Sequence, residues 1–377
     1  MIPFSQRALR RWGVSTSGVL LTLGCQAAPQ TPASFGPMYP AAPATPRVQF
    51  LTALSGERDL ARDAPTWFRK LVGAPQAEST PLQKPYGLAA HAGRLYVCDT
   101  NRRDIFVFDF AAGTFSQWNH PGTALNKPVA LRIGPDGGLD VCDAGSNQVL
   151  RFARDGRLIA TLGWKEPAPE QAASGSASFH PVGIADGPDG CLAVLNGAAH
   201  RIELLDPTSG QSRGSWGSLG SREGQLYRPN GMAQARSGEL LVSDPLNRRV
   251  MVFDVTGKPQ KPIGEPGDQP GYIAHPRGLT VSDAGVVFLG DVALQMVQMF
   301  DLQGQYLMSF GQLPEGSAVL SPAGICVDRS CLPYFQRFIA PDFDAEYLIF
   351  VANQVGPDKI LVYAFGHATT DSQASRN

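Results

Sequence analysis

Acidic and amide side chains recur at a fixed spacing along this chain of 377 residues. In five places an Asp or Asn follows a proline by 14 or 15 residues, and these residues are Asp99, Asp143, Asn196, Asp244 and Asp291. Carboxylates can act as general acids and bases, and both carboxylate and amide side chains can bind a divalent cation through oxygen. A catalytic acid is not expected in five equivalent places, so we interpret them as structural residues that accept backbone N–H groups in turns.

The prolines that define this spacing begin a repeat. Each is followed two residues later by Gly or Ala and then by an aliphatic residue, at intervals of 43 to 53 residues, and the copies begin at Pro85, Pro128, Pro181, Pro229, Pro276 and Pro322. Turn residues divide the unit into four short β-rich runs. Four strands in about 45 residues are typical of a propeller blade. We therefore predict an all-β fold, a six-bladed β-propeller of four-stranded blades over residues 47–366.

The motif suits the innermost strand of a blade. Proline at a strand entry removes no ladder hydrogen bond, and a small residue lets neighbouring backbones approach at the crowded centre of the ring. We expect the Gly or Ala of each copy to lie at such a close approach.

The sixth repeat lacks its outermost strand. Its apolar runs at residues 323–327, 347–351 and 360–365 are followed by Gly366 and a polar end. A spare β-rich segment at residues 47–56 precedes the first repeat. We predict that this N-terminal strand completes the last blade, with residues 48–54 paired to residues 360–365.

Residues 1–24 have the features of an export signal. Three arginines precede a short apolar stretch at residues 19–23, which is too short for a membrane-spanning helix. Gly24 followed by Cys25 is similar to a bacterial lipoprotein cleavage site, so we expect a lipid on Cys25. Cleavage without lipidation and an uncleaved anchor are the alternatives.

A Pro/Ala-rich tether is expected at residues 25–46. Such a segment favours an extended form of about 3.1 Å per residue. Gln26 follows the candidate lipid cysteine, which favours anchoring to the bacterial outer membrane, on either its periplasmic or its cell-surface side. Residues 367–377 are polar and are expected to form a disordered tail.

The charge balance argues against a nucleic-acid partner. Without the three arginines of the signal, 29 basic residues face 33 acidic ones, a net charge of −4. Nucleic-acid binding needs a basic footprint. We expect a protein partner instead, and a chain that is monomeric by itself.

The clearest copy of the repeat, at residues 229–254, contains Pro-x-Gly, an apolar run, Asp-x-x-Asn-Arg and Val-x-x-Phe-Asp. This pattern resembles the NHL repeat, and the resemblance covers residues 47–366. With its export signal and tether, the chain resembles bacterial NHL-propeller lipoproteins, some of which are associated with multihaem cytochromes. The resemblance implies a closed six-bladed ring and an exported redox or cytochrome complex as a partner.

Two enzymatic alternatives can be compared with the same motif. Peptidyl-amidoglycolate lyases, which resemble NHL proteins, place zinc-binding histidines directly after the proline. Here those positions hold no histidine, and their residues are Tyr86, Val129, Val182, Asn230, Arg277 and Ala323. Gluconolactonase-like propellers need carboxylate and Asn ligands around a central cation, and Asn230 has no evident carboxylate partner. We therefore expect no metal and no cofactor, with a metal-dependent hydrolase or lyase in the central channel as the alternative.

The cysteines suggest no redox chemistry within the chain. No Cys-x-x-Cys-His motif occurs, so no covalent haem is expected. Cys326 and Cys331 flank a turn in the last repeat and could form a disulfide in an exported protein. Two unpaired thiols fit the spacing equally well.

Partner-binding residues are expected where the repeat is interrupted or carries charge. An insertion at residues 329–346 is rich in aromatic side chains, which dominate binding hot spots, and its candidates are Tyr334, Phe335, Phe338 and Phe343. The alternative is that this insertion covers its own blade. The turn arginines Arg102, Arg103, Arg248 and Arg249 are the remaining candidates. A second insertion at residues 57–73 predicts a short helix around Trp67 that packs on the ring.

These observations favour a non-catalytic, lipid-anchored scaffold of the cell envelope. A regular ring without an assembled catalytic set is expected to act by binding another protein, through a loop face that combines the turn arginines with the aromatic insertion.

Overall fold

The computed structural model describes residues 35–41, 44–60, 81–118, 125–163, 179–312 and 318–369. Four predictions lie wholly or largely outside these residues: the export signal with Cys25, most of the tether, the helix around Trp67 and the tail from residue 370. Within the described ranges, no helix is long and apolar enough to cross a membrane.

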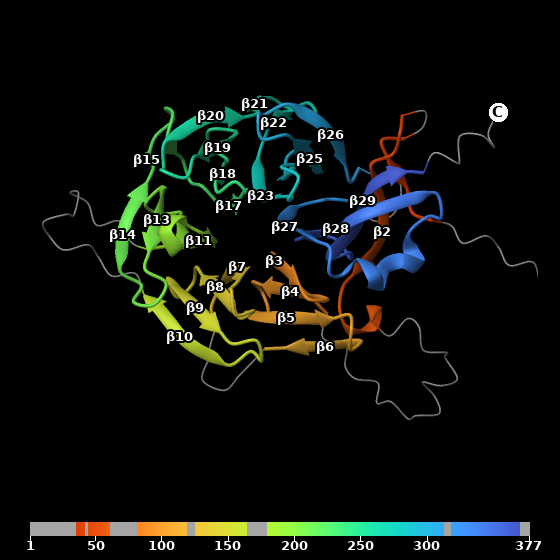
Figure 1. Cartoon of the computed structure of the whole chain (residues 1–377), viewed down its shortest axis with the longest axis horizontal. Helices are drawn as coiled ribbons and strands as arrows, with labels where there is room; N and C mark the ends of the chain where they lie inside the picture. Colours follow the sequence, from red (N-terminus) through yellow and green to blue (C-terminus); the bar gives the residue numbers. More distant parts are fainter. Residues whose placement is uncertain are drawn as a thin grey trace, which may run out of the picture. The chain divides into compact units, whose positions relative to one another are not determined.

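Six antiparallel sheets are arranged around a central axis, which confirms the predicted propeller (Figure 1). Blade one contains β3 (Pro85–His91), β4 (Arg94–Asp99), β5 (Asp104–Asp109) and β6 (Thr114–Gln117). Blade two contains β7 (Pro128–Ile133), β8 (Leu139–Asp143), β9 (Gln148–Phe152) and β10 (Leu158–Gly163). Blade three contains β11 (Pro181–Asp186), β12 (Leu192–Asn196), β13 (Arg201–Leu205) and β14 (Ser212–Trp216).

The second half of the ring repeats this order. Blade four contains β17 (Gly231–Gln234), β18 (Leu240–Asp244), β19 (Arg249–Phe253) and β20 (Pro259–Ile263). Blade five contains β23 (Pro276–Val281), β24 (Val287–Asp291), β25 (Met296–Phe300) and β26 (Tyr306–Phe310). Blade six contains β27 (Pro322–Asp328), β28 (Phe343–Asn353), β29 (Ile360–Ala368) and, from the other end of the chain, β2 (Val48–Leu54).

The N-terminal strand closes the ring as predicted. β2 pairs antiparallel with β29, from Val48 opposite Phe365 to Leu54 opposite Ile360. A bulge lies between Phe50 and Thr52. The last blade therefore contains strands from both ends of the propeller sequence, which ties its first and last segments together.

The end of the expected tether differs from an extended spacer. Strand β1 (Met38–Tyr39) pairs with β2 and makes the last blade a five-stranded sheet. The Tyr39 ring packs 6.2 Å from the ring of Phe310, and burial raises the pKa of Tyr39 to about 12. An aromatic side chain that finds an apolar surface explains why this part folds onto the blade.

Apolar side chains fill each of the six interfaces between neighbouring blades. Phe106 and Phe350, for example, lie in one fully buried cluster between blades one and six. The middle strands are covered on both sides because each blade packs against two others. This explains why they appear in the sequence as continuous apolar runs rather than as alternating patterns.

The inner strands pack closely enough to exclude side chains at the repeated glycines. A Cβ atom on Gly278 would lie 1.8 Å from the carbonyl oxygen of Ala323 in the next blade. At Gly324 it would lie 2.1 Å from the carbonyl oxygen of Tyr86, where the last blade meets the first. Glycine is therefore required by backbone contact at these two copies of the motif, and the expected close approach is observed there.

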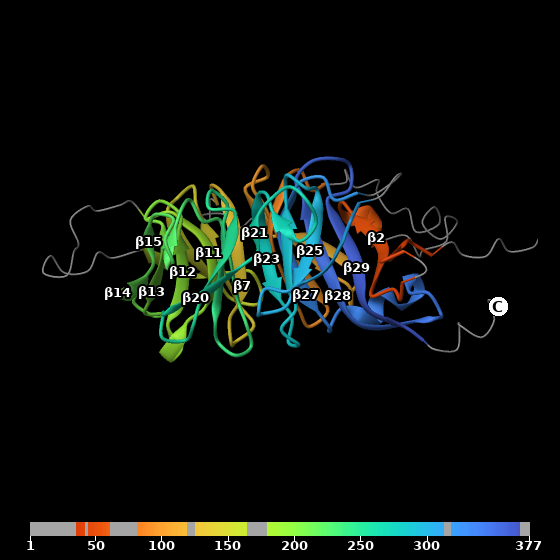
Figure 2. The same cartoon turned by 90° about the horizontal axis from the view of Figure 1, so that it is seen from above.

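The ring has two distinct faces. We call the proline face the one where the inner strands begin, which also carries the turns between the second and third strands. Two short parallel pairs extend the connections here: β15 (Ser218–Leu219) with β16 (Gln225–Leu226), and β21 (Glu265–Pro266) with β22 (Tyr272–Ile273). The labels β15 and β21 lie toward the upper side in Figure 2, and the blue helical ribbon of η4 (Leu332–Phe338) lies on the lower side.

Candidate functional site

The repeated Asp and Asn residues hold the turns and strand entries of the proline face in place. Each is buried at the end of a second strand and accepts backbone N–H groups. Asp291 accepts from Ala274 at 2.8 Å, from His275 at 3.1 Å, and from Ala293 and Leu294 at 3.0 and 3.1 Å. Its carboxylate therefore fastens the entry of one inner strand to the turn beside it.

The other blades use the same arrangement. The residues equivalent to Asp291 are Asp99, Asp143, Asn196, Asp244 and Asn353, and each accepts at least one N–H from the connection that leads into its inner strand. Asn353 fills the role in the last blade, 31 residues after its proline, because the aromatic insertion separates the two. This geometry agrees with the predicted structural role.

The two sets of partner-binding candidates lie on opposite faces. The turn arginines Arg102, Arg103, Arg248 and Arg249 follow the second strands and therefore lie on the proline face. The aromatic insertion follows β27, at the end of the inner strand that is remote from its proline. The expectation of one loop face that combines both sets is therefore not met, because a strand length separates them.

Three of the four turn arginines are engaged within the chain. The Arg249 guanidinium pairs with Asp244 at 3.1 Å and donates to the carbonyl of Arg222 at 2.9 Å. Arg248 donates to the carbonyl of Gly267 at 2.6 Å, and Arg102 to that of Pro81 at 3.4 Å. Arg103 is exposed. Arg248 and Arg249 therefore hold connections in place rather than present a free charge.

Most of the aromatic insertion belongs to the core. Phe335 and Phe343 are 3% and 5% exposed and join the cluster between blades six and one. Phe338 is half-buried, with the Arg337 guanidinium 4.6 Å from its ring centre. Tyr334 is 41% exposed and packs against Phe110 of blade one. The structure thus favours the interpretation in which the insertion covers its own blade, with Tyr334 as the exposed one of the four aromatic candidates.

Cys326 and Cys331 are free, buried thiols. Burial raises the pKa of both, with the nearby Asp328 carboxylate as a second cause. Cys98 and Cys142 are likewise buried and free, as expected of small apolar residues. The raised pKa values keep these sulfurs protonated and unreactive.

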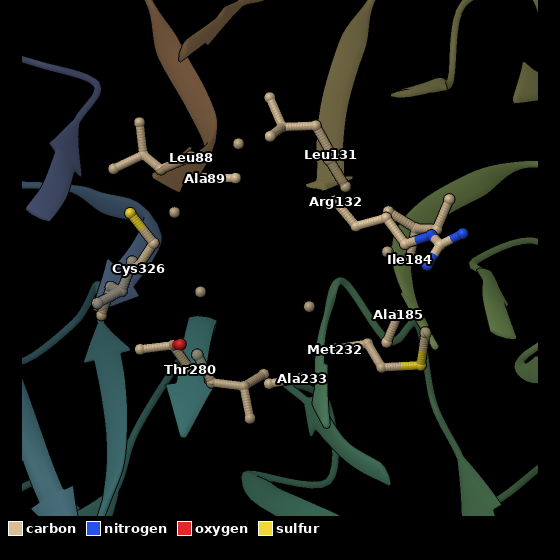
Figure 3. A pocket seen from close by; sticks show the side chains of 18 of the residues that line it. Leu88, Ala89, Leu131, Arg132, Ile184, Ala185, Met232, Ala233, Thr280 and Cys326 are labelled. Atoms are coloured by element: carbon tan, nitrogen blue, oxygen red, sulfur yellow. The ribbon is translucent and has the colours of Figure 1, made fainter. Parts of the chain in front are cut away.

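The six inner strands line a central channel with a cavity of about 350 Å³. Figure 3 shows Leu88, Leu131 and Met232 around it, with smaller side chains between them. Arg132 reaches the wall, where Asp140 binds its guanidinium at 2.7 Å and Asp186 also pairs with it. This part of the channel is thus mainly apolar, and its cation is neutralised.

The channel end at the proline face is more polar. Tyr86 and Asn230 line the cavity directly after the prolines of their blades. Burial raises the pKa of Tyr86, and the Arg277 charge acts in the opposite direction. The Asn230 side-chain oxygen is buried and has no hydrogen-bond partner. A polar group of this kind is satisfied when a ligand or water donates to it.

The donor set for a metal is weak in the described part of the chain. No group of three His, Cys, Asp or Glu side chains there is arranged to hold an ion. The recurrent carboxylates, which could have supplied oxygen ligands, instead accept several backbone N–H groups, as Asp291 does.

Comparisons with known proteins agree on the fold. No protein-family model matches the sequence, and no curated protein matches it. A protein of unknown function from Bacteroides thetaiotaomicron has a TM-score of 0.56 at 14% identity, covering 85% of this chain and 76% of its own. A gluconolactonase from Xanthomonas campestris has a TM-score of 0.51 at 16% identity, covering 89% of this chain and 98% of its own.

A third similar structure is catalytically inactive virginiamycin B lyase from Staphylococcus aureus with quinupristin. Its TM-score is 0.51 at 16% identity, covering 75% of this chain and 96% of its own. The lyase and the gluconolactonase are six-bladed β-propellers, the class to which the fold assigns this chain. At such identities the likeness concerns the fold alone.

Proposed function

We propose that this chain is a non-catalytic, lipid-anchored scaffold of the cell envelope that docks a protein partner on its proline face. The observation that carries the proposal is a concentration of exposed apolar side chains on the turns and connections of that face, namely Leu219, Tyr227, Leu246, Tyr272 and Val355. Each is 44% to 58% exposed. They are five of the ten large apolar side chains that are exposed in the described part of the chain, and exposed apolar surface on one face is a feature of interaction sites.

The arrangement of these residues supports docking. Tyr227 packs edge-on against His200 with ring centres 6.1 Å apart, so its ring is held in place while it stays accessible. Asn247, next to Leu246, donates to the carbonyl of Gly220, which ties two of the connections together. An apolar surface fixed in this way loses little conformational entropy on binding.

The address and the kind of partner rest on the sequence. The export signal, Cys25 and the tether suggest a lipid-anchored protein of the outer membrane. The resemblance to NHL-propeller lipoproteins suggests an exported redox or cytochrome complex as the partner.

Cross-linking with mass spectrometry on intact native cells tests the proposal. A protein partner is expected to be recovered with the native chain, and the double variant Tyr227→Ser, Leu246→Ser is expected to lose it. Tyr334→Ser, which changes an exposed aromatic residue on the other face, is the matched control. Recovery of no reproducible partner, or equal recovery with the double variant, contradicts the proposal.

A metal-dependent hydrolase or lyase in the channel is the second candidate. The unpartnered side-chain oxygen of Asn230 in the cavity wall favours it. Elemental analysis of the purified chain tests it, because a stoichiometric divalent metal would support this candidate and its absence after metal supplementation would reject it.

A further inference from the structure

The residue before each inner-strand proline is cationic or an imidazole in five of the six blades. These residues are Lys84, Lys127, His180, Arg228 and His275, and we call them the cation ring; Ser321 holds the sixth position. The channel cavity reaches the residues that directly follow most of these prolines, such as Tyr86 and Asn230. The cation ring therefore borders the mouth of the channel at the proline face.

The ring positions are held at one level by the turn residues beneath them. Lys84, Lys127 and His275 donate their backbone N–H groups to Asp99, Asp143 and Asp291 at 2.6 to 3.1 Å. His180 donates in the same way to Asn196. At Arg228 the backbone N–H donates instead to His200.

Neighbouring members of the ring affect one another. The His180 ring nitrogen Nδ1 lies 3.2 Å from the side-chain amide of Asn147 on blade two. Burial lowers the pKa of His180, and the Lys127 charge from blade two lowers it further. The Lys127 charge therefore reaches His180 on the next blade, and because the lowered pKa favours the neutral imidazole, the positive charge of the ring comes mainly from Lys84, Lys127 and Arg228.

The side chains of Lys84, Lys127 and Arg228 are exposed, and no carboxylate pairs with them in the described part of the chain. The carboxylates beneath them are occupied by backbone N–H groups. Arg94, which is remote from the proline face, is by contrast paired with Asp109 at 2.7 Å. Three unpaired cations on separate blades thus lie around the mouth.

A further cation lies one step deeper. Arg277 follows the proline of blade five and donates only to neutral oxygens, those of Gln354 at 3.0 Å and Ser321 at 3.4 Å. The Tyr86 hydroxyl is within its electrostatic influence. The proline face therefore has guanidinium, ammonium and hydroxyl donors on several blades next to the channel, which suits carboxylate or phosphate oxygens.

We propose that the channel mouth binds a small multivalent anion, a polycarboxylate or a phosphorylated compound, held by the cation ring and Arg277. A multivalent anion fits because the cations stand on separate blades, so one ligand must carry several charges to meet several of them. The buried, unpartnered oxygen of Asn230 can accept a hydroxyl donor from such a ligand. This site is distinct from the apolar docking residues and does not require a protein partner.

Calorimetric titration of the purified full chain with citrate and with pyrophosphate tests the site. The two arms distinguish carboxylate from phosphate ligands, and acetate serves as the monovalent comparison. Saturable one-to-one binding of at least one multivalent anion is expected, and it should weaken as salt is added. Absence of saturable binding to both anions at low ionic strength overturns the proposal.

Matched triple variants show where the anion binds. Lys84→Ala, Lys127→Ala, Arg228→Ala should lower the affinity about three- to a hundredfold, from typical values for three exposed charge pairs. Arg154→Ala, Arg157→Ala, Arg236→Ala removes the same charge from exposed turns elsewhere on the ring and should change the affinity less than about twofold. Equal losses in both variants, with unchanged circular dichroism, would show non-specific attraction. Failure to recover a cross-linked partner with the native chain, together with intact anion binding, would reject only the docking proposal.

Discussion

Replacing Gly278 with alanine should separate two blades at the centre of the ring. The new Cβ atom would lie 1.8 Å from the Ala323 carbonyl oxygen, where real Cβ contacts are essentially never below 3.0 Å. The two backbones must therefore move apart by at least 1.2 Å, the difference between those distances. The Ala323 carbonyl oxygen is a backbone atom and not the end of a flexible side chain, so the strain falls on the interface between blades five and six.

The expected cost follows from two opposing effects. Alanine lowers the entropy of the unfolded chain, which stabilises the protein by about 0.4–1 kcal/mol where the backbone tolerates it. Overpacking costs about 1–3 kcal/mol, and a clash between two backbones lies at the upper end. We expect Gly278→Ala to lower the free energy of unfolding by about 2 kcal/mol, the balance of these two effects.

Gly183→Ala is the matched control. At the same motif position in blade three, the nearest atom to the new Cβ is the Met232 Cβ at 3.1 Å. A shift of a few tenths of an ångström relieves that contact, so the free energy of unfolding should change by less than about 1 kcal/mol. Denaturant unfolding followed by tryptophan fluorescence measures both variants. Equal stability of the two would refute the claim that backbone contact at the centre of the ring requires glycine.

Three further predictions concern the turns, the imidazoles and the thiols. Asp291→Ala should lower the free energy of unfolding by about 3 kcal/mol or more, because it leaves several N–H groups without an acceptor; Asp291→Asn should cost less in the same assay, since Asn196 holds this position in another blade. The pKa of His180 is lowered from 6.5 in the folded chain, so the unfolded chain takes up the proton first as the pH falls. The contribution of His180 to the free energy of unfolding is therefore fully present above about pH 6.5 and is lost as the pH falls through the lowered pKa. Urea unfolding at about pH 7.5 and about pH 5.5 should show a smaller difference for His180→Gln than for the native chain. Cys326 and Cys331 should resist iodoacetamide in the folded chain and react fully in denaturant without reductant; a mass that shows them protected in denaturant would indicate a disulfide.

Features with a local physical cause could be predicted from the sequence. Pro276 and Gly278 mark an inner strand for two local reasons. Proline fits a strand entry where no N–H is needed, and glycine fits a backbone contact that leaves no room for a Cβ atom. Ring closure followed from a missing strand at one end and a spare strand at the other, which β2 and β29 confirm.

Features that depend on three-dimensional packing were harder to predict. β1 forms because Tyr39 meets Phe310, a contact between residues far apart in the chain. The position of Tyr334 on the face opposite to the turn arginines depends on strand direction, which the composition of the insertion does not reveal. The cation ring had a sequence signal, since Lys84 and its equivalents each precede a proline, but its position around the channel mouth becomes evident only in the closed ring.

Site-specific photocrosslinking tests the central claim most directly. A photoreactive phenylalanine would replace Tyr227 or Tyr272 on the proline face, or Tyr334 on the opposite face, in intact native cells. All three are tyrosines that are 41% to 44% exposed, so the positions differ mainly in the face they report. The account predicts adducts with the same envelope protein from Tyr227 and Tyr272 and none from Tyr334. Adducts from Tyr334 alone would place docking on the aromatic insertion and contradict it.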